Sequence, residues 1–265
     1  MILEDFHVHT TYCDGKDTPE TVVLSAISKG LSSLGFSGHS HTPHDKSYCM
    51  SLDKTRDYRA EILFLREKYA DKIKIYCGLE QDYYSDTDLT PFDYAIGSSH
   101  YIKADGQYIP VDEKPQILLD AANVHFHGDI YSLIENYYHQ EADIIAKTGA
   151  DIIGHFDLIT KFNESGKLFD ENAPRYITAA TDALDELLKT GVPFEINTGA
   201  ISRGYRTSPY PSNFLLKRIA EKGGCVVLSS DSHTAKTLCA KFQECENYCI
   251  SIGLRLESFS PNKKV

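Results

Sequence analysis

The 265-residue sequence predicts an α/β protein whose parallel strands close into one barrel. Short apolar runs of four to seven residues alternate with longer helical patterns along the chain. These runs are rich in Ile, Val, Leu, Phe and Tyr and are mostly unalternated, which is typical of parallel strands buried on both faces. Because no break in composition separates them, we expect a single domain that spans residues 1–265.

Seven apolar runs are predicted as strands. In chain order they are Ile2–Val8, Ser33–Ser37, Ile73–Leu79, Tyr94–Ser98, Ile152–His155, Pro193–Ile196 and Cys225–Ser229. Helical patterns separate most of these runs, so consecutive strands are expected to form βα units and to pair in parallel.

Helical patterns fill the intervals between the strands. The first begins with Thr18 as N-cap and Pro19 at the first helical position, and it ends at Gly30. The later helices are predicted at Leu52–Ala70, Ile130–Thr148, Ala173–Thr190, Asn213–Lys222 and Thr234–Ile252. Three of these end in the same way, with a lysine in the last turn and then a glycine, which is a typical stop signal.

Two stretches lack a regular pattern. Residues Lys103–Asp129 contain two glycines and two prolines, and they are predicted to form a long loop of the kind that serves as a lid or binding loop. The C-terminal stretch Ser258–Val265 is predicted to be a frayed tail.

Charge and composition exclude several classes of function. The chain has 27 Lys and Arg against 38 Asp and Glu, a net charge of −11, and its cations are scattered. We therefore expect no nucleic-acid partner and no binding to an anionic membrane. No apolar run approaches the roughly 20 residues of a membrane span, and the N-terminus lacks the pattern of a signal peptide. A cytoplasmic location is expected, and the oligomeric state is left open.

The seven cysteines are an odd number and contain no Cys-x-x-Cys pair. They are predicted to be free thiols that pack as small apolar side chains in a reducing compartment. Cys245 and Cys249 lie four residues apart on a predicted helix, a spacing that would also suit a metal site or a disulfide.

Every predicted strand delivers a histidine or a carboxylate at its C-terminal end. In chain order these residues are His7, His9 and Asp14; His39 and His41; Glu80 and Asp82; His100; His155 and Asp157; Glu195; and Asp231 and His233. In a parallel barrel all these ends lie on one face, where active sites are built. A lone histidine at a strand end is usually a hydrogen-bonded structural residue, but the coincidence over seven strands indicates a site.

The composition of this site points to bound metal ions. So many imidazoles and carboxylates would repel and desolvate one another at great cost unless cations lay among them. Neutral imidazole nitrogens and carboxylate oxygens are ligands that Zn²⁺, Mn²⁺ and Fe²⁺ prefer. A single ion takes about four to six ligands, fewer than the candidates present, so more than one ion is expected.

The ordered set of motifs resembles that of the polymerase-and-histidinol-phosphatase (PHP) family, and most closely its monofunctional histidinol-phosphatases. The motifs are His7-Val8-His9-Thr10, Phe36-Ser37-Gly38-His39, Gly78-Leu79-Glu80-Gln81-Asp82, Gly97-Ser98-Ser99-His100, Ile153-Gly154-His155-Phe156-Asp157-Leu158, Glu195-Ile196-Asn197-Thr198 and Ser230-Asp231-Ser232-His233. No single motif is specific, but the ordered set is, and it extends from residue 1 to about residue 240.

The resemblance implies a distorted, TIM-like (β/α)7 barrel with a trinuclear centre of Zn, Mn or Fe. It implies three ligand sets, the first two of which share Glu80: His7, His9, Glu80 and Asp231; Glu80, His100 and His155; and Asp14, His39 and His233. Some family members carry histidine at the position of Asp14, so the third set is the least secure.

The resemblance also implies an activity, the hydrolysis of L-histidinol phosphate to L-histidinol and inorganic phosphate in histidine biosynthesis. The alternative on the same scaffold is a phosphoesterase for another small phosphomonoester, such as a nucleotide or a sugar phosphate. An editing exonuclease, an amidohydrolase and a non-catalytic metal-binding module agree less well with the length, charge and motifs.

Hydrolysis of a phosphate dianion at such a centre needs groups of three kinds. Metal ions would bind phosphate oxygens, and a water that bridges two ions would supply hydroxide for in-line attack on phosphorus. Arg203 and Lys161 follow the strand ends at Asn197 and His155 and are expected to bind phosphate at the barrel mouth. Asp231, His233 or a metal-bound water would protonate the leaving group.

Several further residues have open or minor roles. His41 would contact the metal cluster, contact the substrate or cap its loop. Asp157, Glu195 and Tyr101 are candidates to contact the imidazole and amino group of the substrate, and Arg206 is a spare cation. His125 and His127 repeat the spacing of the first motif, but no predicted strand precedes them.

Overall fold

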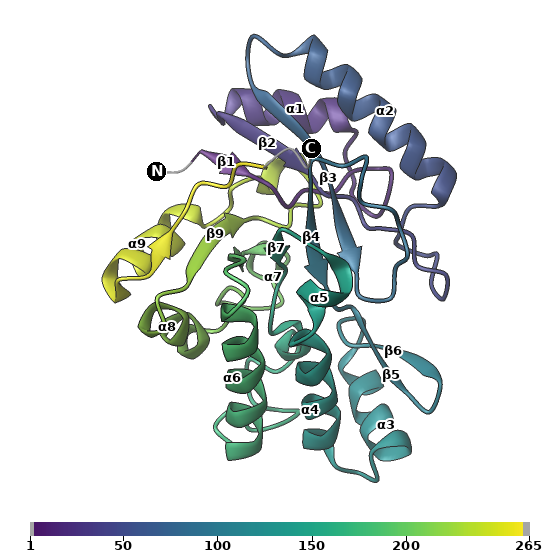
Figure 1. Ribbon diagram of the computed structural model, residues 1–265, viewed down its shortest axis with the longest axis vertical. Coiled ribbons are helices and arrows are strands. Elements are labelled where there is room, and N and C mark those ends of the chain that lie inside the picture. The colour runs from purple at the N-terminus through teal and green to yellow at the C-terminus, as the bar shows by residue number, and fades with distance from the viewer. Residues whose placement is uncertain (1–2, 262–265) are drawn as a thin grey trace.

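The computed structural model describes residues 3–261, in which a curled sheet of parallel strands carries helices on its outer side (Figure 1). The strands in spatial order are β1 (Glu4–Asp5), β2 (Ser33–Phe36), β3 (Lys74–Asp82), β4 (Tyr94–Ser98), β7 (Ile152–Ile153), β8 (Phe194–Asn197), β9 (Cys225–Ser229) and β10 (Arg255–Leu256). The first seven of these are the predicted strands, although Ile2 lies outside the described residues.

The sheet curls until β1 and β9 approach each other. They meet through one isolated parallel bridge between Val8 and Ser232. Two backbone hydrogen bonds accompany it: His9 N donates to Ser232 O (2.9 Å), and Ser232 N donates to His7 O (3.0 Å). The predicted distorted, TIM-like α/β architecture is therefore confirmed, and this thin seam is where the sheet departs from a regular barrel.

Helices cover the outer side of the sheet (Figure 1). They are α1 (Pro19–Ser28), α2 (Leu52–Lys68), α3 (Pro115–His125), α4 (Ile130–Glu141), α5 (Ile144–Thr148), α6 (Pro174–Leu188), α7 (Gly199–Ser202), α8 (Asn213–Glu221) and α9 (Phe242–Ile252), with short 3₁₀ turns at Leu158–Thr160 and Ala235–Thr237. The predicted cap is present, since Thr18 Oγ1 accepts a hydrogen bond from Thr21 N. Within residues 3–261, none of the helices has the length and apolar character needed to cross a bilayer.

Apolar side chains pack on both sides of the sheet. Outside it, one cluster joins α1 and α2 to β2 and β3, and a larger cluster joins β7, β8 and β9 to α4, α6, α8 and α9. Inside the curl, Phe6, Tyr94, Ile96, Ile152 and Val227 form a third cluster. This plug fills the interior near the amino ends of several strands, so polar side chains are left to gather at their carboxyl ends.

The stretch Lys103–Asp129 was predicted to lack regular structure, and this part of the prediction was wrong. It contributes most of an antiparallel hairpin, β5 (Tyr101–Ala104) and β6 (Gln107–Pro110), followed by α3. Asp105 and Gly106 both have positive φ angles, 47° and 81°, as a two-residue hairpin turn requires. The Asp-Gly dipeptide is thus the sequence signal for this turn, and the predicted loop did not take it into account.

Three further boundaries differ from the prediction. The helix expected at Ile130–Thr148 divides into α4 and α5. The helix expected at Thr234–Ile252 begins only at Phe242, because Cys239 and Lys241 have positive φ angles and Cys239 N donates to buried Asp5. Part of the expected C-terminal tail, residues 258–261, is described. Its Phe259 packs on Phe6, with ring centroids 5.0 Å apart, whereas residues 262–265 lie outside the described part of the chain.

Candidate metal centre

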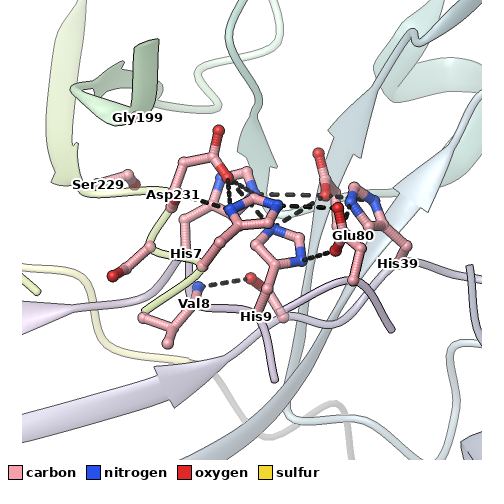
Figure 2. A network of polar contacts seen from close by, with 12 residues as sticks. His7, Val8, His9, His39, Glu80, Gly199, Ser229 and Asp231 are labelled. Carbon is pink, nitrogen blue, oxygen red and sulfur yellow. Dashed lines mark hydrogen bonds and ion pairs between the residues drawn. The ribbon is translucent and has the colours of Figure 1, made fainter. Parts of the chain in front are cut away.

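The nine predicted metal ligands gather at the carboxyl edge of the sheet. His7 and His9 follow β1, His39 follows β2, Glu80 lies in β3, His100 follows β4, His155 follows β7, and Asp231 and His233 follow β9. Asp14 reaches the same place from the loop before α1. In Figure 2 the rings of His7, His9 and His39 converge on the carboxylates of Glu80 and Asp231. Residues separated by more than two hundred positions therefore meet because parallel strands end on one face.

Glu80 is the hub of the cluster and is 1% exposed. Its Oε2 lies 2.8 Å from His39 Nδ1, 3.4 Å from His7 Nε2 and 3.5 Å from His9 Nε2. Its Oε1 lies 3.0 Å from His155 Nε2 and 3.4 Å from His100 Nε2. One carboxylate thus faces five imidazoles that come from four different strand ends.

Two more carboxylates complete the cluster. Asp231 Oδ1 lies 3.2 Å from His9 Nε2 and 3.5 Å from His233 Nδ1. Asp14 Oδ2 lies 3.1 Å from His233 Nε2, and its Oδ1 lies 3.5 Å from His39 Nε2. Asp231 is buried, whereas Asp14 is half-buried at the outer side of the cluster.

The backbone at Asp231 is unusual. Its φ angle is +47°, a left-handed conformation that few residues other than glycine adopt, and it turns the side chain into the cluster. Gly199 leaves the space for that side chain. A Cβ atom at Gly199 would lie 2.7 Å from Asp231 Oδ2 and 2.8 Å from Asp231 Cβ. The placement of this carboxylate therefore depends on the start of α7 as well as on β9.

The pKa values of the clustered side chains show that the buried carboxylates favour positive charge close to them. Burial alone would raise the pKa of Glu80, but the imidazoles of His39 and His7 hold this pKa well below the usual carboxyl range. Burial alone would lower the pKa of His7, but Glu195 and Glu80 raise it well above the usual imidazole value. His9 behaves oppositely: burial and its neighbours His233 and His39 lower its pKa to about 3. Metal cations bound among the carboxylates would neutralise the negative charge that bound protons otherwise neutralise.

The donor set fits divalent metal ions. His7 Nε2, His9 Nε2 and Asp14 Oδ1 are buried and lack a hydrogen-bond partner, which is costly unless another ligand satisfies them. Ligand atoms within 4.8 Å of one another form three groups: His9, Asp14, His39 and His233; His7, His9 and Glu80; and His39, Glu80 and His100. These groups resemble the three implied sets, except that His9, His39 and Glu80 each belong to two groups, and Asp231 and His155 belong to none.

A cavity of about 510 Å³ opens above the cluster. Seven of the nine candidate ligands line it, and His7 and His9 lie beneath them. Lys16, Lys161 and Arg203 supply positive charge to its wall, as predicted for the last two. Arg203 also contacts the cluster directly, because its Nη2 donates to Asp231 Oδ2 (2.9 Å) and its Nη1 to His233 Nδ1 (2.8 Å).

Lys161 is paired within the cavity wall. Its Nζ donates to the backbone oxygen (2.7 Å) and to the carboxylate (3.0 Å) of Asp112, which lies between β6 and α3. Asp112, Asp45 and Tyr48 also line the cavity, and none of the three was predicted as a site residue. They lie in connecting segments, where neither strand ends nor a spacing rule marks them.

Several predicted contacts are absent from the cavity wall. His41 is not among the described residues that line it, and its Nδ1 lies 3.2 Å from Met50 O, as a residue that caps its loop would. Arg206 is buried and donates to Thr160. His125 ends α3 and contacts Asp105 at 2.9 Å, remote from the cluster. His125 and His127 therefore share only a sequence spacing with His7 and His9, and His125 does not join the cluster.

Asp157 and Glu195, predicted as candidate contacts of the substrate, are fully buried and do not line the cavity. Asp157 accepts a hydrogen bond from Ser212 N (2.9 Å). Glu195 lies against His7 on the side away from the cavity. The prediction was therefore wrong for both: Glu195 lies in β8, where side chains alternate in direction, and Asp157 lies four residues after β7 with its side chain buried in the protein. The third candidate, Tyr101, does line the cavity.

All seven cysteines are free in the structure, as predicted. Cys245 and Cys249 are buried on α9 and do not form a disulfide. Cys13 is the one that approaches the metal centre, since its Sγ lies 3.5 Å from His9 Nδ1.

Comparisons with known proteins agree with this geometry. Residues 5–199 match the model of the PHP domain. A Deinococcus radiodurans protein named "Probable histidinol-phosphatase" is 30% identical over 98% of this chain and 97% of its own length. A Lactococcus lactis protein named "Histidinol-phosphatase" is 25% identical over 88% of this chain and 84% of its own length.

Solved structures support the fold. A Listeria monocytogenes protein assigned as a histidinol phosphatase superposes with a TM-score of 0.78 at 20% identity, over 91% of this chain and 99% of that chain. Histidinol phosphate phosphatase of Lactococcus lactis, solved with zinc, L-histidinol and phosphate, gives a TM-score of 0.67 at 22% identity over 97% of both chains.

Proposed function

The chain belongs to the PHP family, and we propose that it is a metal-dependent phosphatase that hydrolyses L-histidinol phosphate to L-histidinol and inorganic phosphate, a step of histidine biosynthesis. The observation that carries the proposal is the cluster of imidazoles and carboxylates with unpartnered buried atoms, beneath a cavity that also holds Arg203 and Lys161. The names of the curated relatives support the choice of substrate.

We assign the candidate ligands to three divalent ions. The proposed sets are His7, His9, Glu80 and Asp231; Glu80, His100 and His155; and Asp14, His39 and His233. When bound, such ions supply Lewis acidity toward phosphate oxygens and a water of lowered pKa. Zinc, manganese and iron all suit these nitrogen and oxygen donors.

The chain's own cations would hold the phosphate. Arg203 presents a planar guanidinium beside the cluster, which suits two oxygens of one phosphate. Lys161, which also lines the cavity, would act as a point charge, once its ammonium is shared between Asp112 and the substrate. The leaving alkoxide needs a proton, and Asp231 and His233, which both line the cavity, are the candidates in the chain to donate it.

The rest of the cavity wall suits the cationic part of the substrate. The rings of Tyr48 and Tyr101 line it together with the carboxylates of Asp45 and Asp112. Tyr101 Oη donates a short hydrogen bond to Asp45, which fixes both groups. Carboxylates would attract an ammonium group, and aromatic rings would pack on an imidazole.

Removal of metal tests the proposal directly. We expect chelation to abolish hydrolysis of histidinol phosphate, and addition of Zn²⁺, Mn²⁺ or Fe²⁺ to restore it, because no other electrophile in the cavity could replace the ions. Phosphate release should be measured for histidinol phosphate, a nucleotide monophosphate and a sugar phosphate. Full activity of a metal-free sample would refute the metal centre, and equal rates on the nucleotide would favour the alternative substrate class.

Replacement of Arg203 by alanine is expected to raise KM more than it lowers kcat. A hydrogen bond to a charged group is worth about 1.5–3 kcal/mol, so kcat/KM should fall roughly 10- to 100-fold. Arg175→Ala is the matched control, because Arg175 pairs with Glu135 and Asp129 on an exposed surface away from the cavity. If steady-state kinetics of Arg203→Ala match those of the control, Arg203 does not bind phosphate.

The cytoplasmic location and the absence of a nucleic-acid partner stay predictions. The proposed substrate is a free small molecule, which agrees with the acidic charge of the chain.

A further inference from the structure

Glu195 in β8 is a buried carboxylate beside the metal centre for which the proposed reaction has no direct use. It is 0% exposed and does not line the cavity. It contacts two candidate ligands at once, the ring of His7 and the backbone of His155. It therefore lies between two strand ends and contacts the centre from the side that faces away from the cavity.

Two of the three partners of Glu195 are fixed hydrogen-bond donors, and the third is a ring nitrogen of His7. Oε1 accepts from His155 N (2.7 Å) and from Asn197 Nδ2 (2.8 Å). Asn197 cannot reverse its amide without loss, because its Oδ1 accepts from Gly199 N (2.9 Å). Oε2 faces His7 Nδ1 at 2.8 Å. The site therefore requires a group that only accepts, which is an ionised carboxylate.

This arrangement determines the tautomer of His7. A carboxylate against Nδ1 keeps the proton of neutral imidazole on that atom, so the lone pair lies on Nε2. His7 Nε2 is the atom that faces the cluster, 3.4 Å from Glu80 Oε2 and 3.7 Å from Asp231 Oδ1, and it has no hydrogen-bond partner. The carboxylate thus leaves the correct nitrogen free to bind a cation.

We propose that Glu195 is a positioning residue that raises the affinity of the centre for divalent ions by fixing the tautomer and orientation of His7 and by tying the His155 backbone to the same carboxylate. This inference rests on the proposed metal centre. It assigns to Glu195 a role in metal loading rather than in substrate contact.

Glutamine at position 195 separates this role from simple packing. It has nearly the same shape, but its NH2 group must oppose either two donors, His155 N and Asn197 Nδ2, or His7 Nδ1. If the NH2 group faces His7, it avoids the two donors at the other oxygen and donates to Nδ1 instead. The proton of neutral His7 then moves to Nε2, where it blocks metal binding. We expect Glu195→Gln to weaken Zn²⁺ binding roughly 10- to 100-fold, as is typical when the partner of a metal-bound histidine is lost.

The measurement is a competition titration of the metal-depleted full chain with Zn²⁺ against a chromophoric chelator, with thermal unfolding of the metal-free forms alongside. Glu141→Gln is the matched control: Glu141 is also buried, and burial raises its pKa to about 8. Among the described residues it forms no hydrogen bond or ion pair with a candidate ligand side chain, and of these ligands only His100 affects its pKa, through charge. Its Zn²⁺ affinity should stay within roughly twofold of the wild type.

Glu195→Asp provides the second variant. It retains an acceptor-only carboxylate but is shorter, so a tautomer-fixing role predicts that it binds Zn²⁺ more tightly than Glu195→Gln, whereas a packing role predicts the reverse order. Unchanged Zn²⁺ affinity in Glu195→Gln, or tighter binding by Glu195→Gln than by Glu195→Asp, would overturn the inference. If the wild type itself binds no Zn²⁺, the proposed metal centre fails instead.

Discussion

Replacement of Glu80 by glutamine is expected to lower kcat for histidinol phosphate by roughly 10³-fold, beyond the 10- to 100-fold typical of residues that only orient a ligand. The two oxygens of Glu80 face five imidazoles from four strand ends, so no other carboxylate of the cluster can take its place. An amide nitrogen cannot bind a cation, and it would direct N–H groups at ring nitrogens that need to act as ligands.

The loss should appear in metal content as well as in rate. We expect purified Glu80→Gln to retain fewer ions than the wild type when both are measured by elemental analysis, and we expect the far-UV circular dichroism to be unchanged. Glu141→Gln again serves as the control, since it removes a buried glutamate on α4 that is not one of the candidate ligands. A variant with wild-type metal content and wild-type kcat would remove Glu80 from the centre.

Most residues of the candidate site could be predicted from the sequence, because this fold brings the residues that follow each strand close together. A parallel barrel places every strand end on one face, so the residues that follow each apolar run are neighbours whatever their separation in the chain. The alternation of runs and helices identified all seven strands, and the observed ends lie within three residues of the predicted ones: β1 ends at Asp5, β3 at Asp82 and β7 at Ile153. Even a short strand can be recognised when its residues are all apolar and helical patterns flank it.

Direction within a strand could not be predicted in the same way. Asp157 and Glu195 follow or end apolar runs just as His155 does, yet both point into the protein. At a strand end a shift of one residue reverses the side chain, and the apolar run alone does not fix that register. Asp112 and Tyr48 were missed for a different reason: they reach the cavity from loops, whose paths depend on tertiary packing.

Replacement of Asp231 by asparagine is expected to have the second largest effect, a fall in kcat of roughly 10²- to 10³-fold. Asparagine is among the residues that tolerate a left-handed backbone, so the φ angle of +47° should persist and the fold should remain intact. Asp231 Oδ2 accepts from Arg203, so the new NH2 group would avoid that donor and face His9 and His233 instead. It would replace an anionic oxygen by a donor at the center of the cluster.

The leaving group distinguishes the two roles open to Asp231. Histidinol leaves as an alkoxide that needs a proton, whereas 4-nitrophenolate leaves without one. If Asp231 acts chiefly by proton donation, Asp231→Asn should recover on 4-nitrophenyl phosphate; if it acts as a metal ligand, both substrates should lose the same factor. We expect equal losses, because Asp231 Oδ1 lies among His7, His9 and His233 rather than free in the cavity.

Asp185→Asn is the matched control for that comparison, because Asp185 also pairs with an arginine, Arg218, but at the surface and without histidines. Its kcat should stay close to that of the wild type on both substrates. If Asp231→Asn recovers activity on the nitrophenyl ester alone, Asp231 is a proton donor and not a metal ligand. The ligand set proposed for His7, His9 and Glu80 would then lack its fourth member.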